Sequence, residues 1–350
     1  MTKKIGIVVN NCFKTPHETE EINAKILREE LLKLGQKVEL FYFKGDGSNG
    51  GIPFSNFKNS DIDEVYLSGK ISNKNFSLLV FYSFFKRIKI HFRIPSYNLS
   101  SFKKYGFLFK LLSKFGILEL YSYDSFHKNF IKENLGLKTR ILEPIINLSE
   151  LSKNLKKDVD VLFVGSLNDL KRGLSELLEA LMIVKKTHPG VRLKIISRYE
   201  VYTKKKDWFA GFRGKRTDIV KTIKSLVEQL GLEKNVIFSG KVESVSKEYD
   251  KAKLYVLPVR DFDKMPPIPF TILESLYHKT PVISSDFWGV SSILEKKFLV
   301  ENDLNDSEFS KDLAKKILWV LKNNPTVSLE KRYYPSESAR KFLSYVDEKI

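Results

Sequence analysis

The spacing of apolar positions predicts a strand, a helix and a second strand at the start of the chain. Lys4 to Val9 is a short β-branched run, and Glu20 to Leu34 carries apolar residues at helical spacing before Gly35, which is placed to stop the helix. Val38 to Phe43 is the next predicted strand. Because this order is typical of parallel sheets with crossover helices, the pattern predicts an α/β fold. The alternation of strands and helices continues through Leu78 to Phe81 and Ile88 to Phe92.

A second α/β unit follows the polar stretch from Asn147 to Asp158, which is typical of a linker. It begins with a predicted strand at Val159 to Gly165, a helix at Ser175 to Thr187 and a strand at Arg192 to Ser197. Further strands are expected at Val236 to Phe238, Leu254 to Pro258 and Pro281 to Ser284, with helices near Asp218 to Leu230 and Thr271 to His278. A length of 350 residues also predicts two domains, at roughly 150 residues per domain.

The charge and the cysteine content limit which partners and which compartment can be expected. Sixty Lys and Arg residues against 42 Asp and Glu give a net charge of +18, which attracts nucleotides, nucleic acid or an acidic membrane surface. The single cysteine, Cys12, cannot form an internal disulfide. The longest apolar run, Phe76 to Phe85, is about half the ~20 residues that cross a bilayer, and the first residues lack a signal-peptide core. We therefore expect a cytoplasmic protein, with the membrane face as one place where it could act.

Most of the familiar motifs in the chain do not support a site. Three Asp-x-Asp pairs, the pattern with which some sugar transferases hold a metal, suggest coincidence, and the pair at Asp158 and Asp160 is expected at a solvated strand start. Five scattered histidines show no metal-ligand spacing. The glycines at Gly211 and Gly214 are too close together for a P-loop. The sequence therefore predicts no metal site and no P-loop chemistry.

One helix start carries the chemistry. Pro269 lies where a helix begins, so the free amides of Phe270, Thr271 and Ile272 are expected to point at an anion. Glu274 follows about one turn inside, where its carboxylate suits two hydroxyl hydrogen bonds from a ribose beside the phosphates. The alternative is that Glu274 only complements the helix dipole on a solvated face.

With its flanking residues, this segment resembles the C-terminal domain of the family 4 glycosyltransferases, two-domain enzymes of the GT-B fold. Glu274 matches the second glutamate of their Glu-x7-Glu motif, and Thr280 to Ile283 matches the turn and strand that follow it. Val161 to Lys171 is similar to the loop in which an arginine and a lysine grip the donor diphosphate. Tyr334 to Val346 is similar to the last helix, which crosses back to the N-terminal domain.

The resemblance implies two Rossmann-like domains whose parallel sheets face a central cleft. The expected division is an acceptor-binding domain over residues 1–153, a nucleotide-sugar domain over 154–333 and the returning helix over 334–350. Lys171 is the main catalytic candidate, because a lysine there acts on the leaving diphosphate. The implied donor-binding residues are Gly165, Ser166, Lys171, Arg172, Lys241, Arg260, Pro269, Phe270, Thr271, Ile272 and Glu274.

The chain departs from the family pattern at several positions, among them Lys279 in place of a glycine and Asn10-Asn11 in place of Gly-Gly, and two departures bear on donor binding. Pro266 replaces the first glutamate, which contacts the donor sugar in the family, and Asp261 or Asp263 is the alternative source of that carboxylate. Ser166 stands at the arginine position, which leaves Lys171 and Arg172, with Arg260 or Lys264, to neutralise the phosphates.

The N-terminal half adds one further catalytic candidate. His91 ends a predicted strand where family members place a histidine facing the donor sugar. The equal alternative is a structural histidine whose hydrogen bonds are satisfied inside the domain.

Ser101 to Gly116 has the pattern of an amphipathic helix. Lys103, Phe107, Lys110 and Lys114 fall on one narrow stripe, a pattern that suits an anionic membrane or the acceptor, and the alternative is a core helix with a solvated lysine face. The aromatic and apolar positions on the opposite arc are Phe102, Tyr105, Leu108, Phe109, Leu112 and Phe115. A second basic patch, Lys204 to Arg216, has no accompanying nucleic-acid fold signature, which argues against nucleic acid as a partner.

The sequence as a whole predicts a retaining, metal-independent hexosyltransferase-type glycosyltransferase without a cofactor. Its donor would be a nucleotide-diphosphate sugar and its acceptor a lipid-linked or membrane-proximal glycan. The alternative is a catalytically inactive GT-B-like basic protein that binds nucleotide or nucleic acid, as the missing glutamate and arginine suggest.

Overall fold

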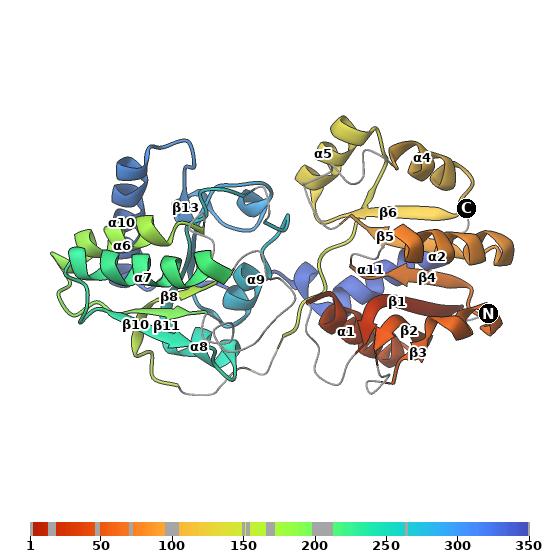
Figure 1. Cartoon of the computed structure of the whole chain (residues 1–350), viewed down its shortest axis with the longest axis horizontal. Coiled ribbons are helices and arrows are strands. Elements are labelled where there is room, and N and C mark those ends of the chain that lie inside the picture. Colours follow the sequence, from red (N-terminus) through yellow and green to blue (C-terminus); the bar gives the residue numbers. More distant parts are fainter. Residues whose placement is uncertain are drawn as a thin grey trace. The chain divides into compact units, whose positions relative to one another are not determined.

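The computed structural model describes residues 3–12, 19–45, 50–69, 73–94, 105–148, 151, 155–165, 172–197, 213–262 and 265–348. The chain forms two compact units, each built on one parallel sheet (Figure 1). Unit 1 comprises Met1–Leu148, Lys264–Ile268 and Glu330–Ile350, and unit 2 comprises Ser149–Asp263 and Pro269–Leu329.

The sheet of unit 1 has seven strands in the order β3-β2-β1-β4-β5-β6-β7, and all of its pairings are parallel. The strands are β1 (Lys4–Cys12), β2 (Lys37–Gly45), β3 (Ile52–Pro53), β4 (Glu64–Leu67), β5 (Lys89–Arg93), β6 (Leu118–Ser122) and β7 (Arg140–Ile141). The helices are α1 (Thr19–Lys33), the 3-10 helix η1 (Phe54–Asn59), α2 (Asn73–Lys86), α4 (Gly106–Lys114) and α5 (Ser125–Leu135).

Two apolar clusters fill the two faces of this sheet. Residues of α2, α4 and α5, such as Leu79, Phe109 and Ile131, pack on one face. Residues of α1 pack on the other face together with α11 (Pro335–Asp347), whose Phe342 is fully buried against the ring of Tyr66. Both faces of a parallel sheet with crossover helices are covered in this way, which explains the continuous apolar runs in its strands.

The last helix of the chain is thus part of unit 1. The 3-10 helix η7 (Lys331–Tyr333) precedes α11, and Pro335 occupies the first turn of α11, where its missing N–H loses no hydrogen bond. The Lys341 ammonium contacts both carboxylate oxygens of Glu143 at 2.8 Å, and the Tyr345 hydroxyl donates to the Ile141 carbonyl at 2.9 Å. These contacts attach the C-terminal segment to the end of the β6–β7 region.

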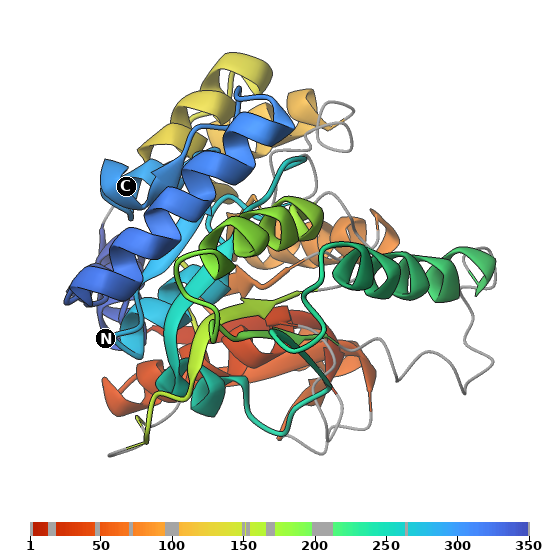
Figure 2. The same ribbon diagram turned by 90° about the vertical axis from the view of Figure 1, so that its left-hand side faces the viewer.

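The sheet of unit 2 has six parallel strands in the order β10-β9-β8-β11-β12-β13. They are β8 (Val159–Val164), β9 (Leu193–Ile196), β10 (Val236–Gly240), β11 (Ala252–Leu257), β12 (Val282–Ser285) and β13 (Leu299–Val300). The helices are α6 (Leu174–Lys185), α7 (Arg213–Gln229), α8 (Val245–Lys251), α9 (Phe270–Tyr277) and α10 (Asp306–Asn323), with the 3-10 helices η5 (Val290–Ser292) and η6 (Lys296–Phe298). Helices α10 and α6 lie side by side on one face of this sheet (Figure 2).

The predicted fold class, two parallel-sheet α/β domains, is confirmed. The strands and helices expected in unit 2 are all present, within a few residues of the predicted bounds. The segment Leu78 to Phe81 belongs to helix α2, and Ile88 to Phe92 overlaps strand β5. Within the described residues, no helix combines the length and the apolar composition that crossing a membrane requires.

Candidate functional site

The strand order of unit 2 reverses at β8, which lies between β9 and β11. In open parallel sheets, ligands bind outside the carboxyl ends of the strands at such a reversal. Gly165 follows β8 and Pro258 follows β11. The next crossover helix is α9, and its N-terminus is the third segment near this edge. These three segments define the candidate donor site.

Gly173 fixes the loop after β8 against the end of β11. Its φ is +73°, and a Cβ added there would lie 1.6 Å from the carbonyl oxygen of Pro258. Only glycine combines this backbone conformation with so close an approach. At the other end of the loop, a Cβ on Gly165 would lie 3.4 Å from Cδ of Arg172. Arg172 therefore lies directly beside the end of β8.

Arg172 supplies positive charge at this position. Its Nε is shielded from solvent and has no hydrogen-bond partner within the residues that the structure describes. Burial raises the pKa of the nearby Tyr255 hydroxyl, while its bond to Thr271 and the charge of Arg172 act in the opposite direction. An unpartnered guanidinium N–H at a strand end is suited to an anionic ligand oxygen.

Helix α9 points its N-terminus toward the same edge. Pro269 is its N-cap residue, and the Tyr255 hydroxyl donates to Oγ1 of Thr271 at 2.9 Å, which ties this end of the helix to β11. The amides of Phe270 and Thr271 precede the first residue that can bond within the helix. The Ile272 amide donates to the Pro269 carbonyl at 3.1 Å. The expectation of three free amides is therefore wrong at Ile272, and two remain.

Glu274 lies one turn inside α9 and is half-buried. Burial raises its pKa to about 7, and the neighbouring Tyr249 hydroxyl offsets part of this rise. In the described part of the chain, no lysine, arginine or histidine contributes to this pKa. Glu274 therefore changes between neutral and charged near neutral pH. As a carboxylate without a cationic partner, it is available to accept hydroxyl hydrogen bonds.

Arg260 was expected to contact the donor phosphates, and the structure contradicts this. Its guanidinium donates to the Asn302 side chain and carbonyl, to the Leu304 carbonyl at 2.7 Å and to Asp306 at 3.2 Å. It also lies 4.5 Å from the ring centre of Phe309. These bonds commit Arg260 to holding the start of α10, so we remove it from the donor site.

His91 has a structural role and not the expected catalytic role. It is fully buried in β5, with Nδ1 2.7 Å from the Tyr121 hydroxyl and Nε2 2.5 Å from the Glu64 carboxylate. The edge of the Phe342 ring covers it at a centroid distance of 5.1 Å. Burial lowers the pKa of His91, although Glu64 acts against this shift. A histidine enclosed by the core in this way cannot face a sugar.

The remaining donor candidates are less well placed or not described. Lys241 is exposed directly after β10, which β9 separates from β8. Asp261 is half-buried in the loop after β11. Ser166, Lys171, Asp263 and Lys264 lie outside the described residues.

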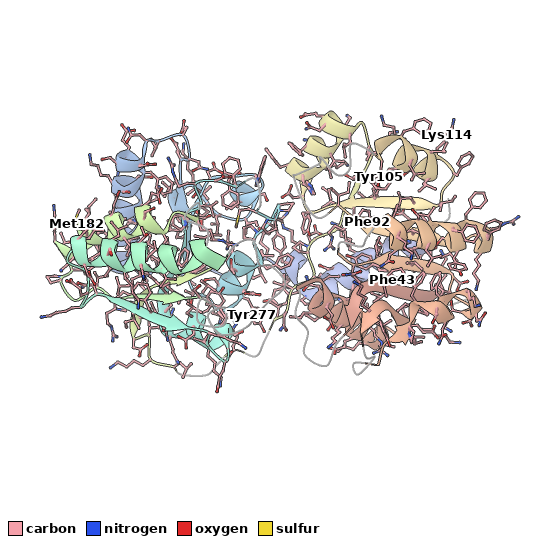
Figure 3. The ribbon with its side chains drawn as sticks, viewed as in Figure 1. Phe43, Phe92, Tyr105, Lys114, Met182 and Tyr277 are labelled. Atoms are coloured by element: carbon pink, nitrogen blue, oxygen red, sulfur yellow. The ribbon has the colours of Figure 1, made fainter. Side chains whose placement is uncertain are left out.

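The amphipathic segment forms helix α4, but the apolar arc of the wheel is only partly buried. Phe109 and Leu112 pack on the sheet as expected, and Figure 3 shows Lys114 at the outer surface with Tyr105 and Phe92 on the inner side. Lys110 and Lys114 are exposed, Phe107 is 79% exposed, and Lys103 lies outside the described residues. Leu108 and Phe115, which lie on the arc opposite the lysine stripe, are exposed as well. The nine-residue helix touches the sheet with too narrow a face to cover them.

Two of the three acidic pairs contribute residues with structural roles. Asp160 accepts from the Arg192 amide at 2.8 Å and pairs with Lys253, as expected for a strand start. Asp61 pairs with Lys4. Over the described ranges, no three His, Cys, Asp or Glu side chains come together as metal ligands would.

Sequence reasoning missed the two tyrosines that support the site, Tyr249 and Tyr255. Tyr249 lies in helix α8 and Tyr255 in strand β11, and their partners Glu274 and Thr271 are 25 and 16 residues further along the chain. Gly173 carried a weak signal, because a glycine after a Lys-Arg pair at a strand-to-helix loop suits a left-handed backbone.

The fold, two parallel-sheet α/β domains, matches that of GT-B glycosyltransferases. The family model described as "Glycosyl transferases group 1" matches residues 147–342, more than half of the chain. The chain therefore belongs to this family, the family 4 glycosyltransferases, whose members are retaining enzymes. No curated protein sequence matches the chain significantly.

Solved structures agree with this fold over nearly the whole chain. A glycosyltransferase from Rickettsia africae has a TM-score of 0.68 at 15% identity, with 99% of this chain and 98% of that chain covered. The lipopolysaccharide outer core galactosyltransferase WaaB has a TM-score of 0.65 at 14% identity, with 98% and 99% covered. Anabaena Alr3699/HepE in complex with UDP-glucose has a TM-score of 0.61 at 14% identity, with 98% and 94% covered.

Proposed function

We propose that this enzyme transfers a sugar from a uridine diphosphate sugar to a lipid-linked or membrane-proximal glycan, with retention of anomeric configuration. The choice of uridine rests on similar structures that hold UDP or UDP-glucose, among them Anabaena Alr3699/HepE. The choice of acceptor rests on the basic and aromatic residues of α4 and on the likeness to WaaG, a glycosyltransferase involved in lipopolysaccharide biosynthesis, and to the lipopolysaccharide outer core galactosyltransferase WaaB.

The observation that carries the donor assignment is the arrangement of Glu274 and the start of α9. The amides of Phe270 and Thr271 have no acceptor among the described residues, and they precede by one turn a carboxylate that has no cationic partner there either. In our proposal the amides and Arg172 bind the diphosphate, because they supply N–H donors and the positive end of the helix dipole. Glu274 then accepts hydrogen bonds from both ribose hydroxyls.

The same groups explain how the sugar would be activated. Breaking the bond between the anomeric carbon and the diphosphate places negative charge on the leaving oxygen. Fixed donors around that oxygen stabilise the charge in the transition state. We assign this role to Lys171, in the loop between Gly165 and Arg172, together with Arg172 itself. The acceptor would approach from the domain of residues 1–153, toward the donor domain of residues 154–333, and domain closure would exclude water. Residues 334–350 would complete the first of these domains.

Calorimetric titration with UDP and with its 2′,3′-dideoxy analogue tests the ribose contact. We expect the analogue to bind at least tenfold more weakly, since one charge-assisted hydrogen bond contributes about 1.5–3 kcal/mol. Equal affinity for the two nucleotides would remove Glu274 from the ribose.

Turnover tests whether the protein is an enzyme or an inactive nucleotide-binding relative. Release of UDP from a panel of UDP-sugars, with an oligosaccharide or lipid-linked acceptor present, is expected only for an active transferase. The anomeric proton signals of the product report retention directly. Tight UDP binding without any turnover across the panel would favour the inactive alternative.

A further inference from the structure

Unit 1 exposes an unusual number of large aromatic side chains. On helix α2, Phe81, Phe84 and Phe85 are 55%, 58% and 69% exposed, and Leu78 continues the row by one turn. On helix α4, Phe107 and Phe115 are exposed together with Leu108 and Leu111. Single exposed apolar residues need no explanation, but a contiguous group of this size marks a surface that meets a partner.

The two helices present these side chains from one side of the sheet. Their inner residues Phe76 and Phe109 meet in an edge-to-face contact at 5.7 Å, and both helices pack on the same apolar cluster (Figures 1 and 3). Along α2, the rings of Phe81 and Phe85 lie 4.7 Å apart, so they form a continuous ridge. We call the exposed apolar residues of α2 and α4 the aromatic face: Leu78, Phe81, Phe84, Phe85, Phe107, Leu108, Leu111 and Phe115.

The chain segment that carries the aromatic face has charges of one sign. Between Glu64 and Glu119 the sequence contains no acidic residue at all, although 42 occur in the whole chain. The basic residues in this interval are Lys70, Lys74, Lys86, Arg87, Lys89, Arg93, Lys103, Lys104, Lys110 and Lys114. Of these, Lys74, Arg87, Lys110 and Lys114 are exposed in the structure on the same two helices and the turn that follows α2.

We propose that the aromatic face docks on a bilayer containing anionic lipid. Phenylalanine rings enter the boundary between headgroups and acyl chains, while exposed lysines and arginine meet the lipid phosphates. This combination distinguishes a bilayer from a second copy of the chain, because the same face of a second copy would bring the same positive charges against these. The sequence pattern pointed only to the lysines of α4, and the structure adds the phenylalanines of α2 as the apolar anchor.

Binding to vesicles measures this directly. We expect the wild type to sediment with phosphatidylcholine vesicles that contain one third phosphatidylglycerol. A triple variant, Phe81→Gln with Phe84→Gln and Phe85→Gln, should partition at least tenfold less, which corresponds to 1.4 kcal/mol. The double variant Lys110→Gln and Lys114→Gln should lose about 25-fold, since each lysine near an anionic surface adds roughly fivefold. Added salt should weaken the wild type and the phenylalanine variant more than the lysine variant.

Matched controls lie elsewhere on the chain. Lys311 and Lys315 are exposed on α10 with the same spacing of four residues, and Leu32 is an exposed apolar residue of α1, on the other face of the same sheet. Glutamine at these positions should leave vesicle binding unchanged. All variants should bind UDP as the wild type does, because the aromatic face belongs to unit 1 and the donor residues to unit 2.

Three outcomes would overturn the proposal. One is equal vesicle binding by the wild type and the triple phenylalanine variant. Another is equal partitioning into neutral and anionic vesicles. The third is a wild type that sediments as a dimer, ignores vesicles and becomes monomeric in the phenylalanine variant, which would make the aromatic face a contact between copies. None of these results bears on UDP binding, so the donor-site proposal is tested separately.

Discussion

Replacing Glu274 with glutamine is expected to stabilise the free protein and weaken its donor binding at the same time. The side chain keeps its size but loses its charge. Burial raises the pKa of Glu274 to about 7 from an ordinary value of 4.5. A carboxyl group with a raised pKa in the folded state contributes stability below pH 4.5, and that contribution is lost as the pH rises through 7.

The size of the effect follows from the shift. One pKa unit corresponds to 1.36 kcal/mol, so above pH 7 the charged Glu274 destabilises the free protein by about 3 kcal/mol at most. The glutamine variant avoids this. Its melting temperature should exceed that of the wild type by up to about 6–12 °C at pH 8, at 2–4 °C per kcal/mol for a domain of this size, and the gain should shrink at pH 5.

Donor binding should change in the opposite direction. Glutamine offers the ribose a neutral acceptor, and the loss of about 1.5–3 kcal/mol corresponds to tenfold weaker UDP binding or more at pH 8. Wild-type affinity should rise between pH 6 and pH 8 as Glu274 loses its proton. The variant should lack that part of the pH dependence, while it shares any titration of UDP itself. Calorimetric titration at pH 5, 6 and 8 measures the change in donor binding, and melting curves at the same pH values measure the change in stability.

The control is Glu308→Gln, which removes an exposed carboxylate from the first turn of α10. Such a helix-dipole interaction is worth only about 0.3–1 kcal/mol, so neither large effect should appear. The reasoning would be refuted by a Glu274→Gln variant that binds UDP like the wild type at every pH. A variant that loses UDP binding because it melts at a lower temperature would refute it equally.

Three further changes test other parts of the site. Lys171→Ala should reduce turnover by at least ~100-fold with little change in melting temperature, and unchanged turnover would turn attention to Arg172. Gly173→Ala should lower both melting temperature and UDP affinity, because its Cβ meets the Pro258 carbonyl, whereas Gly231→Ala, at a similar φ of +63° in open space, should show only a small stability loss. Arg260→Ala should lower the free energy of unfolding by about 2 kcal/mol, measured in urea, and leave UDP affinity intact; a matching loss of affinity would return Arg260 to the donor site.

The sequence was sufficient for the sheets and for the start of α9 because both depend on local patterns. Apolar runs gave the strands of unit 2, and Pro269 with Glu274 located a helix end and its carboxylate. The same local reasoning predicted that Asp160 lies at a strand start, and the structure places it there. Wherever the determining contacts lie within one or two turns, residue spacing alone carried the prediction.

The sequence was not sufficient where the partners of a side chain are distant in the chain. Arg260 resembles a phosphate ligand in sequence, but its partners lie 42 to 46 positions further on. His91 finds Glu64 27 positions before it and Tyr121 30 positions after it, on neighbouring strands. No periodicity shows which cations and histidines are already satisfied, and only unsatisfied groups remain available to a ligand.

The availability of a group for a ligand also explains why Arg172 and Glu274 remain donor-site candidates when Arg260 and His91 do not. In a folded protein nearly every buried polar group finds a partner, so one without a partner at the edge of a strand reversal is worth explaining. Arg172 keeps an unbonded Nε beside Gly165, and Glu274 has a pKa that burial raises without a compensating cation in the described residues. An arginine N–H without a partner and a carboxylate without a cationic partner, both at one sheet edge, suit a ligand that carries both an anion and hydroxyl donors. A nucleoside diphosphate has both, and its binding would supply the interactions that folding alone leaves unmade.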